Sequence, residues 1–287
     1  MRRLYFPFVA VGLSLLLGCA TAPPTPTADQ YFADTKKSLV AMDYEAALKN
    51  LDRLIKAAGN EPLGQEGKLI RAALLISMAE GTKQMADAYN TGSKQAAARF
   101  QYNDFVKMKS DYYGVSRTRL MSAMEAILAQ RKEISGKPMP LSMPFPQFSG
   151  VENVTVAQIK TGRWVPDADR VRAELDTVNN AFAYTLARWV GAGENVHKGH
   201  ELFEKGAVQI DPRVYLIETS SHFMKLSEIF GRMALDEPRY RSICHDVITG
   251  SLETLAKLLE AAPDKDLEAR RKKMKAECDK RAKELGL

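Results

Sequence analysis

The sequence has no apolar run of about 20 residues, the length that a membrane-spanning helix requires. Its longest apolar run covers residues 4–17, only 14 residues with Pro7 among them. The chain also has no nucleophile-elbow motif and no glycine-rich loop of the kind that cradles phosphate. These absences leave no candidate for a mature membrane span and no sequence support for catalysis, so we expect a protein that is not an enzyme.

A strong charge of one sign is also missing. Lys and Arg number 41 against 35 Asp and Glu, a formal net charge of +6. An excess this small gives no support for nucleic-acid binding, and none is expected. Hydrophobic residues make up 45% and charged residues 26%, the ordinary balance of a folded globular protein, which excludes disorder along the whole chain.

Cysteine is scarce, with three residues in 287. Cys19 closely follows the apolar run, whereas Cys244 lies in an apolar stretch and Cys278 in a highly charged one. In an oxidising compartment the last two could form a disulfide. Their different surroundings favour two separate thiols, with the disulfide as the alternative.

The N-terminus has the layout of an export signal. A positive start, residues 1–3, precedes the apolar run 4–17, and Gly18-Cys19 follows it. A small residue before a cysteine at this point resembles the lipobox of bacterial lipoproteins. The resemblance implies that residues 1–18 are a signal peptide removed before Cys19, and that Cys19 carries covalent lipid such as palmitate. The alternative is an ordinary secretory signal followed by a chance cysteine.

Residues 19–28 form the expected tether. Residue 20 is alanine rather than aspartate, which by resemblance to Gram-negative lipoproteins implies sorting to the outer membrane, with the body facing the periplasm. The segment ATAPPTPTA after Cys19 is rich in Pro and Thr and predicts an extended, semi-rigid spacer. We expect no cofactor other than the covalent lipid. Several acyl chains together anchor a protein stably, so the membrane is one expected partner.

Beyond the tether, apolar residues recur mainly with helical period. The sequence predicts an all-α fold of antiparallel helical hairpins, with about nine or ten helices and almost no strand. An N-terminal half, 29–134, and a C-terminal half, 166–287, are separated by a Pro-rich loop, 135–165. Within that loop, 151–164 alternates in polarity and is expected to be a short strand or irregular, and 102–114 is left unassigned. The expected helices cover 29–42, 44–58, 65–80, 116–134, 166–190, 194–208, 211–234, 236–261 and 264–287.

Residues 29–62 resemble a tetratricopeptide repeat, a pair of helices about 34 residues long. The residues that match are Asp43, Tyr44, Ala47, Leu48, Leu51 and Leu54. A weaker trace, 207–212, resembles the end of a second repeat. The family implies a concave helical surface that binds a peptide, a partner protein or a small ligand, and it implies no catalysis.

All four histidines lie within residues 197–245, among several carboxylates. Glu194 and His197 make one Glu-x-x-His step, a spacing found in carboxylate-bridged metal bundles, but Glu218 and His222 do not repeat it. The candidate metal ligands are His197, His200, Glu201, His222 and His245. Solvated or individually hydrogen-bonded histidines are the favoured alternative, so no metal cofactor is expected.

Aromatic residues gather between residues 89 and 113. They are Tyr89, Phe100, Tyr102, Phe105, Tyr112 and Tyr113. Such a set could line a ligand groove, but core packing is favoured because aromatic side chains dominate protein cores.

These features together predict a membrane-anchored envelope lipoprotein that acts as a scaffold or adaptor, binding a partner protein or peptide through a helical groove. The alternative is a small-molecule or metal-binding accessory protein of a periplasmic transport system.

Overall fold

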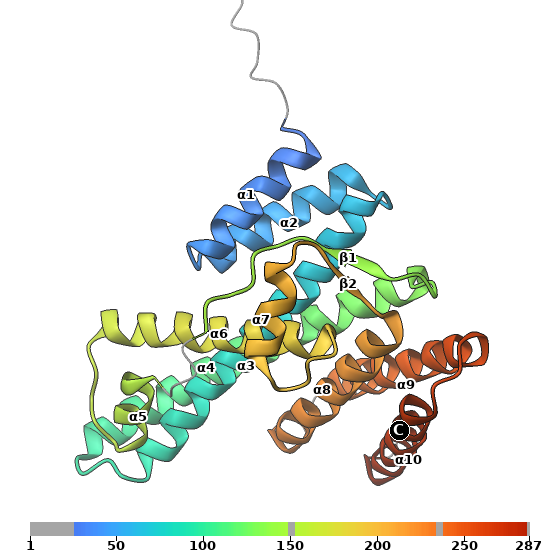
Figure 1. Ribbon diagram of the computed structural model, residues 1–287. Coiled ribbons are helices and arrows are strands. Elements are labelled where there is room, and N and C mark those ends of the chain that lie inside the picture. The colour runs from blue at the N-terminus through green and yellow to red at the C-terminus, as the bar shows by residue number, and fades with distance from the viewer. Residues whose placement is uncertain (1–25, 149–152, 234–237, 286–287) are drawn as a thin grey trace, which may run out of the picture.

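The computed structural model describes residues 26–148, 153–233 and 238–285, and this part of the chain is all-α (Figure 1). It contains ten α-helices, one short 3-10 turn and a sheet of two short strands, so the predicted fold of helical hairpins is confirmed. The helices are α1 (Ala28–Val40), α2 (Tyr44–Ala58), α3 (Pro62–Ser93), α4 (Arg99–Gln130), α5 (Val154–Lys160), α6 (Asp167–Trp189), α7 (Val196–Glu204), α8 (Pro212–Met233), α9 (Pro238–Ala261) and α10 (Lys265–Leu285). The strands are β1 (Met139–Leu141) and β2 (Val208–Ile210), and the 3-10 turn is η1 (Arg131–Glu133).

The first hairpin, α1 with α2, follows from local sequence signals. Thr27 and Gln30 exchange side-chain-to-backbone hydrogen bonds in a capping box that starts α1. Asp43 starts α2, its side chain accepting a hydrogen bond from the Ala46 backbone N–H at 3.1 Å. The apolar stripe of α2 is buried, as its spacing predicted. This hairpin has about the length of one tetratricopeptide repeat, which contains two helices. Helix α3 alone has 32 residues, so it is too long to be one helix of a second such repeat.

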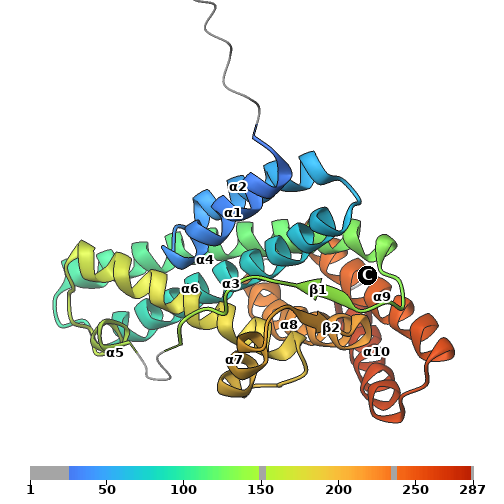
Figure 2. The same cartoon turned by 45° about the horizontal axis from the view of Figure 1, so that its top comes forward.

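Helix α3 is the centre of the fold. It contacts α2, α4 and α6, which lie on different sides of it (Figure 2). The helices α3 and α4 have 32 residues each and so span about 48 Å. The predicted helix end at residue 80 is wrong, and the unassigned stretch 102–114 is helical. Nearly every residue of α3 between positions 69 and 79 is buried, so this helix lacks the one-sided apolar pattern that marks helix limits in a sequence.

The backbones of α3 and α6 approach closely at Gly81. A Cβ atom at this position would lie 2.6 Å from the Val178 Cα. One turn earlier, the Ser77 hydroxyl lies 3.3 Å from the Thr185 hydroxyl across the same interface. Glycine and small polar residues therefore set how deeply α6 sits against α3.

The Pro-rich segment crosses the molecule as an extended strap, residues 138–148. Its first part is β1, which pairs with β2 in antiparallel register, Met139 opposite Ile210. One hydrophobic core includes buried residues from Phe32 to Cys278, so the two predicted halves share it. The strap thus links the halves, and its residues Leu141 and Met143 are buried in the shared core.

Residues 154–160 form helix α5, where alternation had predicted a short strand or an irregular segment. The Asn153 side chain accepts hydrogen bonds from the backbone N–H groups of Thr155 and Val156, which starts the helix. Val156 and Ile159 are buried in a smaller core cluster. Their spacing of three fits one face of a helix, and alternation over so few residues does not distinguish helix from strand.

The helices after the strap largely match their predicted ranges, with one correction. The predicted helix over 194–208 is shorter, because α7 ends at Glu204 and residues 208–210 form β2. The weaker repeat trace at 207–212 therefore lies on a strand and the start of α8. Asp211 begins α8, accepting a hydrogen bond from the Arg213 backbone N–H at 2.8 Å. Among the helices described, none combines the length and the apolar character needed to cross a bilayer.

Candidate binding groove

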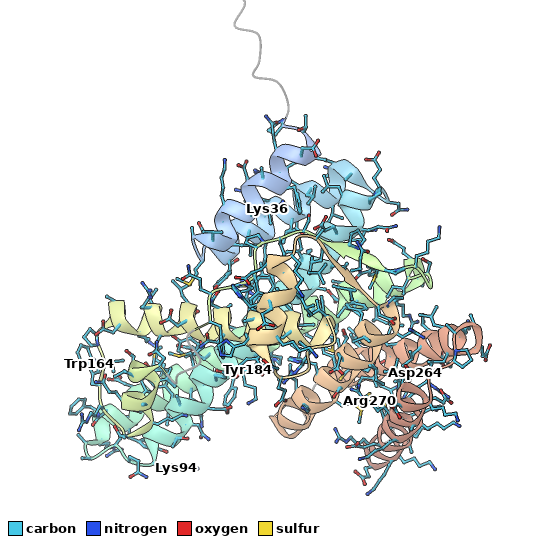
Figure 3. All side chains as sticks on the ribbon, viewed as in Figure 1. Lys36, Lys94, Trp164, Tyr184, Asp264 and Arg270 are labelled. Carbon is cyan, nitrogen blue, oxygen red and sulfur yellow. The ribbon has the colours of Figure 1, made fainter. Side chains whose placement is uncertain are left out.

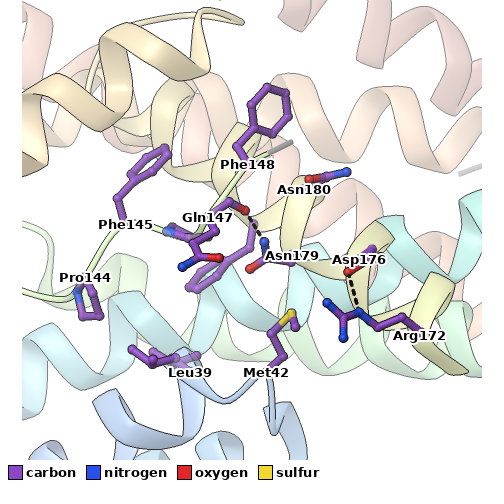
Figure 4. Close-up of a pocket in the computed structure, with 13 residues that line it drawn as sticks. Leu39, Met42, Pro144, Phe145, Gln147, Phe148, Arg172, Asp176, Asn179 and Asn180 are labelled. Atoms are coloured by element: carbon purple, nitrogen blue, oxygen red, sulfur yellow. Dashed lines mark hydrogen bonds and ion pairs between the residues drawn. The ribbon is translucent and has the colours of Figure 1, made fainter. Parts of the chain in front are cut away.

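A groove opens where the α1–α2 turn, the strap and α6 meet (Figure 4). Its volume is about 500 Å³. The turn contributes Leu39, Val40 and Met42, and the strap contributes residues 144–148. Helix α6 contributes Arg172, Asp176, Asn179, Asn180 and Phe182. The turn and the strap are mainly apolar and α6 is mainly polar, so the groove has walls of two chemical kinds.

Met42 forms the turn between α1 and α2 in an unusual backbone conformation. Its φ is +56°, and it is the only residue other than glycine with a positive φ in the described chain. The turn closes through two hydrogen bonds, from the Met42 N–H to the Leu39 carbonyl at 3.1 Å and from the Asp43 N–H to the Ser38 carbonyl at 2.9 Å. This is the helix-ending geometry that usually carries glycine. Here a half-buried methionine side chain lies on the groove wall instead.

The strap forms the opposite wall and is held by aromatic contacts. The Phe145 ring centroid lies 5.1 Å from that of Phe203 on α7. The Phe148 ring lies 5.3 Å from Tyr184 on α6, edge to face. Between them, the backbone carbonyl of Gln147 accepts a hydrogen bond from the Asn179 side-chain amide. These contacts fix the strap on α6 and α7 without a regular strand in this part.

Asn179 joins the α6 wall to both the strap and α2. Besides donating to the Gln147 carbonyl, its Oδ1 accepts a hydrogen bond from the Tyr44 hydroxyl at 3.3 Å. Burial, with a smaller contribution from Asp176, raises the pKa of Tyr44, so the phenol keeps its proton and remains a donor. Asp176 in turn accepts from the Asn153 amide at 2.8 Å and lies 3.4 Å from the Arg172 guanidinium. The polar wall is therefore held in place before any ligand arrives.

The candidate metal ligands lie on three helices and do not converge. His197, His200 and Glu201 are exposed on α7, His222 is buried on α8, and His245 is half-buried on α9. In the part of the chain that the structure describes, no three His, Cys, Asp or Glu side chains are grouped so as to hold a metal ion. The three-helix ligand set considered from the sequence is therefore not assembled.

His222 has a separate buried environment between α3, α6 and α8. Its Nδ1 lies 3.2 Å from Nη1 of Arg188, which can only donate, so Nδ1 accepts and Nε2 carries the ring proton. Nε2 lies 3.3 Å from Oε2 of Glu80, although the two atoms are not aligned as a hydrogen bond. Burial lowers the pKa of His222, and the opposing effect of Glu80 is smaller. The residue is a neutral core histidine.

Two of the three cysteines lie in the part of the chain that the structure describes. Cys19 and residues 20–25 of the tether lie outside the described residues. Cys244 on α9 and Cys278 on α10 are buried and are not joined as a disulfide, as their surroundings predicted. Burial raises the pKa of the Cys278 thiol, which favours its protonated form.

The aromatic set divides between core and surface. Tyr89 lies 5.1 Å from Phe105 and 5.8 Å from Tyr112, ring centroid to ring centroid, and all three are buried. Core packing is confirmed for them. Phe100 and Tyr102 are 73% and 49% exposed, so core packing is wrong for these two. They lie in the first turn of α4, where no other helix covers them.

Sequence reasoning missed the groove because its residues carry no motif. Neither Met42, which directly precedes the Asp43 helix cap, nor Asn179 belongs to a recognisable sequence motif. The one available signal was the position of Met42, directly after a helix and before Asp43, where glycine is the usual residue. No family model, no curated protein and no solved structure matches the chain, so the groove is interpreted from its own geometry.

Proposed function

We propose that this chain is a lipid-anchored protein of the bacterial envelope, and that its body is a non-catalytic adaptor which holds a segment of a partner protein in the groove. Cys19 would carry the lipid, with the outer membrane as the expected site and the body in the periplasm. The export signal and the resemblance to a lipobox support the location. The groove supports the binding role.

The observation that carries the binding role is the strained backbone of Met42. A residue with a Cβ atom in this left-handed region costs about 1–2 kcal/mol, which glycine would avoid. A methionine side chain is flexible and polarisable, and it adapts to differently shaped apolar groups. Backbone strain of this kind concentrates at binding sites, and here it places an adaptable side chain on the groove wall.

The two kinds of wall suit an extended peptide. The side-chain amides of the exposed Gln147 and the half-buried Asn180 line the groove and offer both donors and acceptors. An extended backbone presents N–H and C=O groups in alternation, which such amides can satisfy. Met42 and Phe145 provide apolar contact for a side chain of the same peptide.

A small solute is the second candidate, and the size of the groove favours it. A volume of about 500 Å³ is within the range of small-molecule sites, about 300–1,000 Å³. The protein would then be an accessory of a periplasmic transport system. A solute that binds the folded state raises the melting temperature of the purified protein. No such rise is expected if the occupant is a partner protein that is absent from the sample.

The anchor is tested by metabolic labelling with an alkynyl fatty acid. The wild-type chain should take up label, and Cys19→Ser should take up none. Equal labelling of both proteins, or none of either, contradicts the proposed anchor.

The groove is tested by a photo-crosslinking amino acid placed at Val40, which is 70% exposed on the groove rim. A matched control is Val115, which is 44% exposed on α4 and does not line the groove. A discrete crosslinked species should form in cells from position 40 and not from position 115. Met42→Gly in the same background should weaken it. Equal crosslinking from both positions would contradict the proposal that the partner binds in the groove.

A further inference from the structure

The end of the α3–α4 hairpin carries an exposed surface, which we call the aromatic tip. It consists of Phe100, Tyr102, Trp164, Lys94, Arg99 and Arg163. Phe100 is 73% exposed, Trp164 68% and Tyr102 49%. Trp164 and Lys94 lie at the same end of the molecule, far from α10 (Figure 3). Three large aromatic side chains are therefore exposed to solvent at this end of the hairpin.

Close contacts hold the two segments of the aromatic tip together. The Gln101 side-chain amide donates a hydrogen bond to the Gly162 carbonyl. Gly162 has a φ of +77°, and a Cβ atom there would lie 3.0 Å from the Gln95 carbonyl carbon. The start of α4 with the turn before it, and the turn after α5, therefore form one edge, and exposed aromatic residues stand on both parts of it.

The charges of the aromatic tip are mainly positive. Arg99 directly precedes Phe100 and Arg163 directly precedes Trp164, so a cation stands beside an aromatic ring in each segment. Residues 94–105 and 160–164 together contain four Lys or Arg and one acid, Asp104. Such a surface complements a negatively charged partner.

We propose that the aromatic tip binds the surface of an anionic phospholipid bilayer. Trp and Tyr prefer the headgroup region, because each joins an apolar ring to a hydrogen-bonding group. Lys and Arg beside them are attracted to the anionic headgroups. This contact needs neither a lipid on Cys19 nor an occupant in the groove.

The arrangement favours a bilayer over a protein partner. The exposed rings come from two segments at the outer end of a hairpin, and an exposed arginine directly precedes an aromatic residue in each segment, so charge interrupts the apolar surface. In a headgroup layer each aromatic or cationic side chain can be accommodated individually, without a matching pocket. A protein interface instead concentrates its energy in a few anchors that fill matching pockets in a desolvated centre.

The two tryptophans of the chain allow a direct test. Trp164 is 68% exposed, Trp189 is 2% exposed, and residues 1–28 contain no tryptophan. The full chain is placed in vesicles of phosphatidylglycerol with brominated acyl chains, which quench tryptophan on contact, and in parallel in brominated phosphatidylcholine. Emission from Trp164 should be quenched in the anionic vesicles and far less in the zwitterionic ones. In Trp164→Phe the quenched component should vanish while the Trp189 emission stays.

Charge variants separate the aromatic tip from general electrostatic attraction. Arg99→Gln combined with Arg163→Gln should lower the docking equilibrium of the tip by about 30-fold, the loss expected for two cations at an anionic surface. The matched control is Lys49→Gln with Lys56→Gln, which removes two exposed cations from α2 and should have little effect. Unquenched Trp164 in anionic vesicles, equal quenching in both lipids, or an equal effect of the two charge pairs overturns the proposal. An unquenched Trp164 would also leave the tip available to a protein. Neither the labelling of Cys19 nor the crosslinking at position 40 depends on these results.

Discussion

At the scale of single residues, Met42 should separate stability from binding. Met42→Gly removes backbone strain of about 1–2 kcal/mol and also removes a half-buried side chain, worth about 1 kcal/mol. The free energy of unfolding should therefore change by less than about 1 kcal/mol in urea denaturation, while groove crosslinking falls.

The contrasting variant is Leu39→Ala, three residues earlier, whose side chain is buried. Its truncation should cost about 2–5 kcal/mol. A Met42→Gly protein that is as unstable as Leu39→Ala would show that the methionine serves packing, and the functional interpretation of its strain would fail.

His222 should make stability depend on pH. Burial lowers the pKa of His222 in the folded protein. On acidification the unfolded chain therefore binds a proton at this residue at a higher pH than the folded chain does. The stability from this residue is fully present above the ordinary histidine pKa of about 6.5 and is lost as the pH falls below it, by up to about 1.4 kcal/mol per pH unit. His222→Gln should flatten this part of the profile of unfolding free energy against pH.

The control for that measurement is His200→Gln, because His200 is exposed on α7. This substitution should leave the slope between pH 7 and 5 unchanged. If His222→Gln has the same slope as the wild type, then carboxylates elsewhere in the protein account for the acid sensitivity.

At the scale of helices, the α3–α6 contact should tolerate no side chain at Gly81. In Gly81→Ala the new Cβ would meet the Val178 backbone at 2.6 Å, so α6 must shift, at a cost of about 1–3 kcal/mol. Gly114→Ala is the matched control, because nothing lies within 4 Å of its Cβ position on α4. The control should gain up to about 1 kcal/mol from helix propensity alone. Equal shifts of the two midpoints in urea would contradict the close approach of α3 and α6.

The helices that the sequence predicted best are those with one buried face. In α2 the apolar residues follow a single stripe, Asp43 caps the start of the helix and Gly59 follows its end. Its limits, Tyr44 and Ala58, were therefore predicted from local signals. In α3 burial extends around the helix, and its pattern therefore gave no sign of where it ends. Helix α5 has only seven residues, too few for a period to be distinguished, and its helical state depends on Asn153 and on packing against α3.

The groove was less predictable than the fold, because it arises from contacts between distant segments. Asn179 meets Gln147 across 32 residues and Tyr44 across 135. No local spacing encodes such meetings. The histidines show the reverse: their spacing suggested a shared site, but His197, His222 and His245 lie on separate helices that do not bring them together.

At the scale of the whole molecule, the shared core should make unfolding a single event. Buried residues from Phe32 to Cys278 belong to one cluster, and Trp189 packs against Tyr215 across α6 and α8 with ring centroids 4.7 Å apart. In the Trp164→Phe variant, Trp189 fluorescence and helical circular dichroism should therefore change at the same urea concentration. Loss of helix signal before the Trp189 change would show that an outer hairpin unfolds independently.

The pairing of β1 with β2 also sets an order of events during synthesis. Met139 and Ile210, which face each other in the sheet, are about 70 residues apart in the chain. At about 5–20 residues per second, the strap waits roughly 4–14 s for its partner strand to be made. Wherever the chain folds, the wall that the strap supplies cannot be fixed until α6, α7 and β2, which hold the strap, are present. The nascent chain thus acquires its binding surface late, and a partner meets it only once most of the polypeptide has been made.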